Sequence, residues 1–304
     1  MNLLITGAAH PTPSQLDDLR ADGHTVWFLQ NEQDALPLPA EEIEGVVANG
    51  LFLHHDIARF SVLRYIQLTA AGLDRVPVDY VRTHGITLHN AAGVYSIPMA
   101  EFAVAAVLSL YKQLAFFRTA QNAHRWDKHR GLREVDGKQV CIIGCGNVGT
   151  ECAKRFRALG CTVRGVDLFP RNDAAYNTIQ PLSALHMALS AADIVVLTVP
   201  LTEDTRHLIG AAELALLKDE AVLVNIARGA IVDTAALTAA LDARPLYAVL
   251  DVFPEEPLPP DSPLWDHEHV LITPHNSFVG EHNGERLWAL IRNNLSNFEG
   301  DAKV

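Results

Sequence analysis

Three side chains in the second half of the sequence could carry out acid–base chemistry on a substrate that bears a carboxylate. Arg228, Glu256 and His275 each follow closely after a short apolar run. A guanidinium can hold a carboxylate through two hydrogen bonds and polarise the carbonyl next to it. An imidazole can deliver or accept a proton, and a carboxylate beside it orients the ring and favours its charged form. The three residue types therefore predict proton transfer at a 2-keto or 2-hydroxy acid.

A glycine-rich turn supplies the second half of such a reaction. Gly144-Cys145-Gly146-Asn147-Val148-Gly149 follows the apolar run Gln139–Ile143 and opens a helical segment, Thr150–Leu159. Glycines there let the backbone approach a pyrophosphate at the helix N-terminus. Asp167 ends the next apolar run, and its carboxylate would accept hydrogen bonds from a ribose diol and repel a 2′-phosphate. The turn predicts NAD as the cofactor, although Arg171 lies close enough to leave NADP open, and glycines needed only for helix packing are the alternative.

The elements that must hold these residues are six apolar runs with helical connections between them. The runs are rich in Val, Ile and Leu without strict alternation, which is typical of strands buried on both faces of a parallel sheet. They predict a doubly wound, Rossmann-type sheet, in which ligands bind beyond the carboxyl ends of the strands. The glycine turn, Arg228, Glu256 and His275 all come after strands and belong at that edge. The predicted strands are Gln139–Ile143, Thr162–Asp167, Asp193–Thr198, Ala221–Ile226, Leu246–Asp251 and His269–Thr273.

The first ninety residues predict a smaller parallel sheet of flavodoxin type, because short apolar runs alternate there with helix-length segments. A helix begins near Ser96, with Pro98 in its first turn, and the tail predicts one more helix over Glu285–Phe298. We therefore expect an α/β protein with a substrate domain of residues 1–94 and 277–304 and an NAD-binding domain of residues 95–276. The predicted strands of the first domain are Asn2–Thr6, His24–Phe28, Gly45–Ala48, Tyr65–Thr69 and Ile86–His89.

Composition excludes several other classes of function. The net charge of -12 and the lack of a Lys- and Arg-rich segment argue against nucleic acid as a partner. The N-terminal residues have no basic segment of a signal peptide. The longest apolar stretch, Ala100–Phe117, carries Glu101 and Lys112, so it predicts a buried helix and not a membrane span. We expect neither a nucleic-acid partner nor a membrane partner.

Metal binding is the remaining alternative, and two groups of residues could suggest it. Four cysteines lie close together, but their spacing matches no zinc pattern, so buried free thiols and a reducing, cytoplasmic setting are expected. His267 and His269 could share one face of a strand, but no third ligand at a sensible spacing accompanies them. We therefore predict no metal. The cysteines are Cys141, Cys145, Cys152 and Cys161.

Taken together, these motifs resemble the D-isomer-specific 2-hydroxyacid dehydrogenase family over nearly the whole chain. The family includes phosphoglycerate dehydrogenases, glyoxylate and hydroxypyruvate reductases, D-lactate dehydrogenases and formate dehydrogenase. The motifs that carry the resemblance are Gly144–Gly149, Val199-Pro200-Leu201-Thr202 with Thr205, Asn225-Ile226-Ala227-Arg228-Gly229, Asp251-Val252-Phe253, Glu256-Pro257 and Thr273-Pro274-His275.

The resemblance implies a role for each matching residue. Arg228, Glu256 and His275 would be the catalytic triad, and Ala71 and Gly72 would offer backbone N–H groups to the substrate carboxylate that Arg228 and His275 also bind. The resemblance also implies a homodimer formed through the cofactor domains, with Ala100–Phe117 and its surroundings as the candidate interface. Besides the glycine turn and Asp167, the residues expected to contact the cofactor are Thr198, Pro200, Thr205, Ile226, Ala227 and Asp251, the last through the nicotinamide carboxamide.

Two departures from relatives narrow the expected substrate. Formate dehydrogenases carry Gln where Glu256 stands, which argues against formate. Phosphoglycerate dehydrogenases place Arg in the loop after the third strand, whereas Asn49–His55 contains no Arg or Lys. We therefore expect a small non-phosphorylated keto acid such as hydroxypyruvate or glyoxylate. The alternatives are a phosphoglycerate dehydrogenase, for which His54 or His55 would partly substitute, and an NADH-sensing binding protein without turnover.

Overall fold

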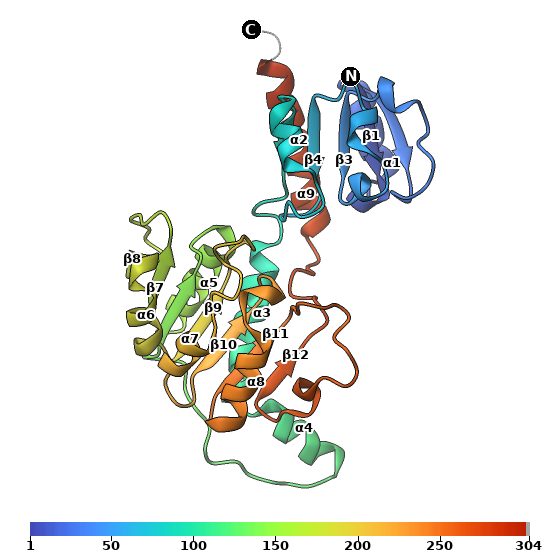
Figure 1. The fold of residues 1–304 in the computed structure, drawn as a ribbon. Helices are drawn as coiled ribbons and strands as arrows, with labels where there is room; N and C mark the ends of the chain where they lie inside the picture. The colour runs from blue at the N-terminus through green and yellow to red at the C-terminus, as the bar shows by residue number, and fades with distance from the viewer. Residues whose placement is uncertain (302–304) are drawn as a thin grey trace. The chain divides into compact units, whose positions relative to one another are not determined.

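The computed structural model describes residues 1–301, of which 299–301 are described by their backbone alone. The chain divides into two compact units, each with its own parallel sheet. Unit 1 is formed by Met1–Tyr95 and the segment from Gly280 onward, and unit 2 by Ser96–Val279. The expected second segment of the substrate domain extends to residue 304, so its last three residues lie outside the described part. The fold class is confirmed as α/β with two parallel sheets (Figure 1).

Unit 1 contains a five-stranded parallel sheet in the order β2-β1-β3-β4-β5, which is the order of flavodoxin-like sheets. The three inner strands are buried along their whole length apart from Asn2, and the edge strand β2 exposes Trp27 and Phe28. The strands are β1 Asn2–Thr6, β2 Thr25–Leu29, β3 Gly45–Ala48, β4 Tyr65–Leu68 and β5 Thr87–His89, and the helices are α1 Pro13–Ala21, α2 Val78–Thr83 and α9 Asn283–Asp301.

The C-terminal helix α9 belongs to unit 1. Leu287, Trp288, Ile291 and Leu295 are spaced to lie on one face of the helix, and all four are buried in the same core as Leu3 and Ile5 of β1 and Tyr65 of β4. Arg286 Nε also donates to the Val94 carbonyl at 2.8 Å. A helix from the end of the chain therefore covers one face of the N-terminal sheet.

Unit 2 contains a seven-stranded parallel sheet in the order β12-β11-β10-β9-β6-β7-β8. Its helices form two layers: α3 and α5 pack on one face of the sheet, and α6, α7 and α8 pack on the other (Figure 1). The strands are β6 Gln139–Ile143, β7 Thr162–Asp167, β8 Thr178–Pro181, β9 Ile194–Leu197, β10 Val222–Asn225, β11 Tyr247–Leu250 and β12 Val270–Ile272, and the helices are α3 Ser96–Tyr111, α4 Leu114–Asn122, α5 Asn147–Ala158, α6 Leu185–Ala191, α7 Ala211–Leu216 and α8 Thr234–Ala243.

The central strand β6 shows why its sequence is apolar throughout. Val140 and Ile142 point into the core shared with α3 and α5, whereas Cys141 and Ile143 point into the core shared with α6, α7 and α8. Successive side chains of a strand alternate between faces, so a strand covered on both sides must be apolar at every position. Because helices cover both faces of the sheet, the glycine turn and the polar loops lie at the edge formed by the carboxyl ends of the strands.

Two expectations about unit 2 were wrong in detail. The sheet has seven strands, not six, because the edge strand β8 (Thr178–Pro181) is short, polar and largely exposed and lacks the apolar run of a buried strand. The stretch Ala100–Phe117 is not one buried helix: α3 ends at Tyr111, Gln113 adopts a left-handed φ of 52°, and α4 starts at Leu114 at an angle of 64° to α3. Among residues 1–301, no single helix meets the length and hydropathy needed to cross a membrane, and only this bent pair meets them jointly.

Candidate active site

The glycine turn connects β6 to the first turn of α5. Gly144 has a φ of 94°, and a Cβ there would lie 2.8 Å from the backbone of Thr198 and Val199. A Cβ on Gly149 would overlap the Gly144 carbonyl oxygen. A Cβ on Gly146, in contrast, would meet no atom within 4 Å, so this glycine faces open space at the N-terminus of a twelve-residue helix. Such a cradle of backbone N–H groups fits the pyrophosphate of a dinucleotide.

Side chains from the neighbouring strands hold this turn in place. Thr198 Oγ1, at the end of β9, donates to the Gly144 carbonyl at 2.6 Å. Asp167, at the end of β7, accepts from Cys145 N at 2.7 Å through Oδ2 and from Phe169 N at 2.9 Å through Oδ1. Each carboxylate oxygen of Asp167 can accept a further hydrogen bond, so these contacts are compatible with the predicted bond to a ribose diol.

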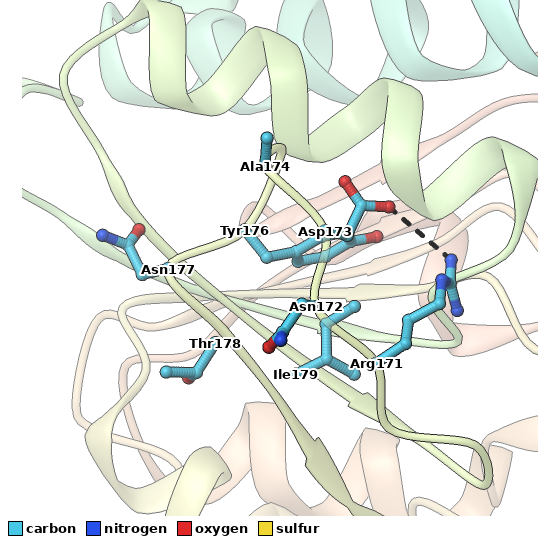
Figure 2. A pocket seen from close by; sticks show the side chains of 8 residues that line it. All are labelled: Arg171, Asn172, Asp173, Ala174, Tyr176, Asn177, Thr178 and Ile179. Atoms are coloured by element: carbon cyan, nitrogen blue, oxygen red, sulfur yellow. Dashed lines mark ion pairs between the residues drawn. The ribbon is translucent and has the colours of Figure 1, made fainter.

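Two residues at the turn, Arg171 and Cys145, have surroundings that the sequence alone did not reveal. Arg171 donates to the carbonyl of Cys145 and forms an ion pair with Asp173 at 3.7 Å. It lines a hollow of about 460 Å³ that is formed by residues 171–179 and contains none of the predicted catalytic residues (Figure 2). Burial raises the pKa of the Cys145 thiol to about 11, so Cys145 stays protonated at neutral pH.

The loops after β10, β11 and β12 come together because these strands are direct neighbours in the sheet. Leu250 of β11 pairs with Asn225 of β10 on one side and with Ile272 of β12 on the other, so the three loops leave the sheet at the same level. Gly229 packs so tightly that a Cβ there would overlap the backbone of Phe253. The turn that carries Arg228 therefore lies against the turn that carries Glu256.

Glu256 and His275 are in direct contact. Glu256 Oε2 lies 2.8 Å from His275 Nδ1, and Glu256 Oε1 accepts from Phe253 N at 2.9 Å. An ionised carboxylate can only accept, so this pair places the ring hydrogen on Nδ1 and leaves Nε2 to exchange a proton with a substrate. The histidine and glutamate side chains are 41% and 37% exposed, which keeps them within reach of a ligand.

Asp251 builds the loop that carries His275. Its side chain is fully buried and accepts three hydrogen bonds, from Thr273 Oγ1 at 2.6 Å, Asn276 N at 2.8 Å and Ser277 N at 3.0 Å. The backbone of His275 also donates to the Asp251 carbonyl at 2.8 Å and has a left-handed φ of 51°. The sequence suggested Asp251 as a cofactor contact but gave no sign that its carboxylate organises this loop.

Arg228 is anchored through its main chain. Asn225 Nδ2 donates to the Arg228 carbonyl at 3.0 Å, and Asn225 Oδ1 accepts from Ala227 N at 3.1 Å. The guanidinium donates to the Ala227 carbonyl at 2.7 Å through Nη1. Asn225 is thus a positioning residue that the sequence motif contained but whose role the sequence did not reveal.

The remaining predicted residues have structural partners of their own. Thr205 Oγ1 donates to the Pro200 carbonyl at 2.7 Å and accepts from Thr202 N at 2.7 Å, which closes the turn after β9. In unit 1, the Ala71 carbonyl accepts from Asn90 Nδ2 at 2.7 Å, and this bond ties the loop after β4 to the segment after β5. Ile226 and Ala227 are buried at the end of β10.

The predicted buried free thiols are confirmed, since all four cysteines are buried and unbridged. Within the described part of the chain, no group of three or more His, Cys, Asp or Glu side chains is arranged to hold a metal ion. His267 lies 3.8 Å from Asp242, and the His269 ring lies against Tyr247.

The doubly wound sheet and the glycine turn define a dinucleotide-dependent oxidoreductase, and comparison with known proteins gives the family. The protein-family model described as "D-isomer specific 2-hydroxyacid dehydrogenase, NAD binding domain" matches residues 104–277. The chain therefore belongs to the D-isomer-specific 2-hydroxyacid dehydrogenases, which are NAD-dependent oxidoreductases that act on the CH–OH group of 2-hydroxy acids. A nicotinamide cofactor follows from this membership.

Several relatives cover most of the chain. It is 36% identical to the (S)-sulfolactate dehydrogenase of Chromohalobacter salexigens over 78% of each chain. It is 34% identical to the glyoxylate reductase of Aeropyrum pernix over 78% of this chain and 73% of that one. The 34% identity to the D-3-phosphoglycerate dehydrogenase of Methanocaldococcus jannaschii covers 76% of this chain but only 44% of the relative.

Among solved structures, the family member from Xanthobacter autotrophicus Py2, crystallised with NADPH and MES, has a TM-score of 0.80 and 29% identity. The alignment covers 98% of this chain and 96% of that one. The likeness therefore extends over both units of the chain.

Proposed function

We propose that this enzyme interconverts a small, non-phosphorylated 2-keto acid such as hydroxypyruvate or glyoxylate and the corresponding D-2-hydroxy acid. The observation that carries the proposal is the 2.8 Å contact between Glu256 and His275 at the sheet edge where Arg228 also emerges. An oriented imidazole beside a carboxylate-binding guanidinium is what keto-acid reduction requires.

In this proposal the residues around the glycine turn hold the cofactor. Gly144, Gly146, Asn147, Val148 and Gly149 receive the pyrophosphate, and Asp167 the adenosine ribose. Bound NADH supplies the hydride. The residues that follow β9, β10 and β11 would hold its nicotinamide end; they are Thr198, Pro200, Thr205, Ile226, Ala227 and Asp251.

The catalytic residues then have separate tasks. Arg228 holds the substrate carboxylate and polarises the keto oxygen. Ala71 and Gly72 are assigned to substrate binding through their backbone N–H groups. His275 gives its Nε2 proton to the oxygen of the reduced carbonyl, and Glu256 compensates the positive charge of the ring before that transfer. In the reverse direction His275 takes the proton back. Unit 1 thus acts as the substrate domain and unit 2 as the NAD-binding domain.

The substrate side chain is the least constrained part of the proposal. Relatives act on sulfolactate, phosphoglycerate and glyoxylate according to their names, so identity alone does not choose among these acids. The loop Asn49–His55 contains no Arg or Lys, which supports a substrate without a phosphate. The runner-up function is therefore phosphoglycerate dehydrogenase, supported by the relatives of that name.

The test is NADH oxidation with a panel of keto acids, with NADPH in parallel because Arg171 lies beside the glycine turn. We expect hydroxypyruvate or glyoxylate to give the highest kcat/KM, and NADH to be preferred over NADPH. Higher kcat/KM with 3-phosphohydroxypyruvate would favour the runner-up. Tight NADH binding without turnover of any keto acid would contradict the proposal and favour an NADH-sensing protein.

We further propose a homodimer formed by the segment that follows α3. Leu114 of α4, Trp126 and Leu132 are 53%, 93% and 39% exposed, and residues 117–130 line a hollow of about 680 Å³. Exposed apolar side chains of this size favour a protein interface. Sedimentation equilibrium should give a dimer for the wild-type enzyme and weaker association for Trp126→Ser, whereas a monomeric wild type would contradict the proposal.

We propose the cellular compartment of the enzyme from the reduced state of its cysteines. Four free cysteines are buried in unit 2 and none is bridged, which supports a reducing setting such as the cytoplasm. Fractionation of cells that express the enzyme, followed by immunodetection, would test this.

A further inference from the structure

The sheet of unit 1 has an anion-binding position that the chain fills with one of its own carboxylates. In this sheet β1 lies between β2 and β3, so the strand order reverses between β1 and β3. Ligands of open parallel sheets bind at such a switch point, beyond the carboxyl ends of the strands. The residues that leave β1 and β3 there are Thr6 and the pair Asn49-Gly50.

Glu32, which follows β2, occupies this position. Its Oε1 accepts from Asn49 N at 2.6 Å and from Thr6 Oγ1 at 2.8 Å, and its Oε2 accepts from Gly50 N at 2.6 Å. Two successive backbone N–H groups that converge on one anion form a nest of the kind that binds phosphate. The short distances are those of charge-assisted hydrogen bonds. The donors of the nest are therefore directed at Glu32.

The surroundings of the nest are mixed in charge. A Cβ on Gly50 would lie 3.4 Å from Glu32 Oε2 and 3.7 Å from Arg75 Cδ, so the aliphatic part of Arg75 approaches the same glycine as the Glu32 carboxylate. His55 Nε2 lies 2.9 Å from the Glu32 main-chain oxygen. The negative charge is held by three hydrogen bonds, whereas the Arg75 side chain is exposed and its charge is screened by solvent.

We propose that Glu32 determines substrate specificity by filling this nest. The inference rests on the proposed function and deepens it: the preferred keto acids carry a neutral group on the third carbon. A phosphate, sulfonate or carboxylate on that carbon meets a negative charge at the loop after β3 and finds the backbone donors of Asn49 and Gly50 already used. Glu32 is a specificity-determining residue and takes no part in the proton transfer.

The test compares two keto acids that differ only on the third carbon, hydroxypyruvate and 3-phosphohydroxypyruvate. The measured quantity is the ratio of their kcat/KM values with NADH, phosphorylated over neutral. We expect Glu32→Gln to raise this ratio by about tenfold, since it removes the charge and keeps the size of the side chain. Glu32→Asp keeps the charge and should leave the ratio low. Glu41→Gln, which removes an exposed carboxylate from the same unit, is the matched control and should not change it.

Two outcomes overturn the inference. If Glu32→Gln lowers both kcat/KM values equally, Glu32 only stabilises the fold. If the wild-type enzyme already prefers the phosphorylated acid and Arg75→Gln abolishes this preference, then Arg75 reads the third carbon and Glu32 does not prevent anion binding.

A second measurement does not depend on turnover, so it separates this inference from the proposed function. Inorganic sulfate at constant ionic strength should raise the Tm of Glu32→Ala, whose nest is empty, more than that of the wild type or Glu32→Asp. An equal effect of sulfate on all three proteins overturns the inference even when no keto acid is turned over. If Glu32→Ala does not fold, the same comparison is made with Glu32→Gly and Glu32→Gln.

Discussion

Replacing Glu256 by Gln tests the contact on which the proposed proton transfer depends. Glu256 uses its two oxygens for two different donors, Phe253 N at 2.9 Å and His275 Nδ1 at 2.8 Å. An amide of the same shape has one oxygen and one NH₂ group, so it can satisfy only one of these donors. If its oxygen faces Phe253, its NH₂ group meets Nδ1–H of the charged ring. If it is flipped, its NH₂ group meets the backbone N–H of Phe253.

The size of the effect follows from the lost hydrogen bond. A hydrogen bond between charged groups contributes about 1.5–3 kcal/mol. The two side chains are 41% and 37% exposed, so screening by solvent places the loss at the lower end of this range, at about 1.5–2 kcal/mol. Since each 1.4 kcal/mol changes a rate about tenfold, kcat/KM for the keto acid should fall by about 10- to 30-fold. The KM for NADH should stay the same, because the proposed cofactor contacts are untouched.

Steady-state NADH oxidation with the best keto acid of the panel measures this effect. Glu255→Gln is the matched control, because Glu255 is the exposed neighbour in the sequence and makes no contact with His275 among those described. The circular dichroism spectrum and Tm of both variants should match the wild type. A Glu256→Gln enzyme within twofold of wild-type kcat/KM, or an equal loss in Glu255→Gln, would refute the reasoning.

Three further outcomes are expected. Asp251→Ala leaves three donors without their buried acceptor and should lower the free energy of unfolding by about 3–5 kcal/mol in urea titrations. A loss below about 1 kcal/mol would contradict this. Gly149→Ala should lower the Tm of the enzyme without cofactor, because the added Cβ overlaps the Gly144 carbonyl oxygen. Gly146→Ala should keep the wild-type Tm and weaken NADH binding in fluorescence titrations, because its Cβ meets no protein atom. Equal Tm values for the two variants would refute this difference. Burial raises the pKa of the thiols of Cys141, Cys145, Cys152 and Cys161 to about 11–12, so the same thiols ionise first in the unfolded chain. Their contribution to the free energy of unfolding should be complete below about pH 9 and lost as the pH rises toward about 12. A urea midpoint that stays constant from about pH 8 to about pH 10.5 would contradict this.

The sequence by itself determined the family and most of the sheet. The runs Asn2–Thr6, Gly45–Ala48, Gln139–Ile143 and Thr162–Asp167 match β1, β3, β6 and β7 residue for residue. These strands are covered on both faces, so their apolar character is a local property that can be read from neighbouring residues. The glycine turn is equally local, because a strand, a turn and a helix follow one another in the chain.

Only the tertiary structure decided the secondary-structure features that depend on contacts between residues far apart in the chain. β8 forms as an edge strand only because β7 offers it hydrogen-bonding groups, and its own sequence does not predict it. The helix break at Gln113 depends on a left-handed backbone that no glycine marks. In both places the local sequence preference is weak, and the surrounding contacts select the conformation.

The site shows the same division. Residue types and spacing were enough to predict Arg228, Glu256 and His275 as the chemical groups, because the loops after adjacent parallel strands must share one edge. They could not predict that Asp251 gathers the loop of His275 or that Glu32 fills the nest after β3. A carboxylate has the same appearance in a sequence whether it faces water or three backbone and hydroxyl donors. Its partners are set by the packing of strands that lie far apart in the chain, so only the folded structure decides its role.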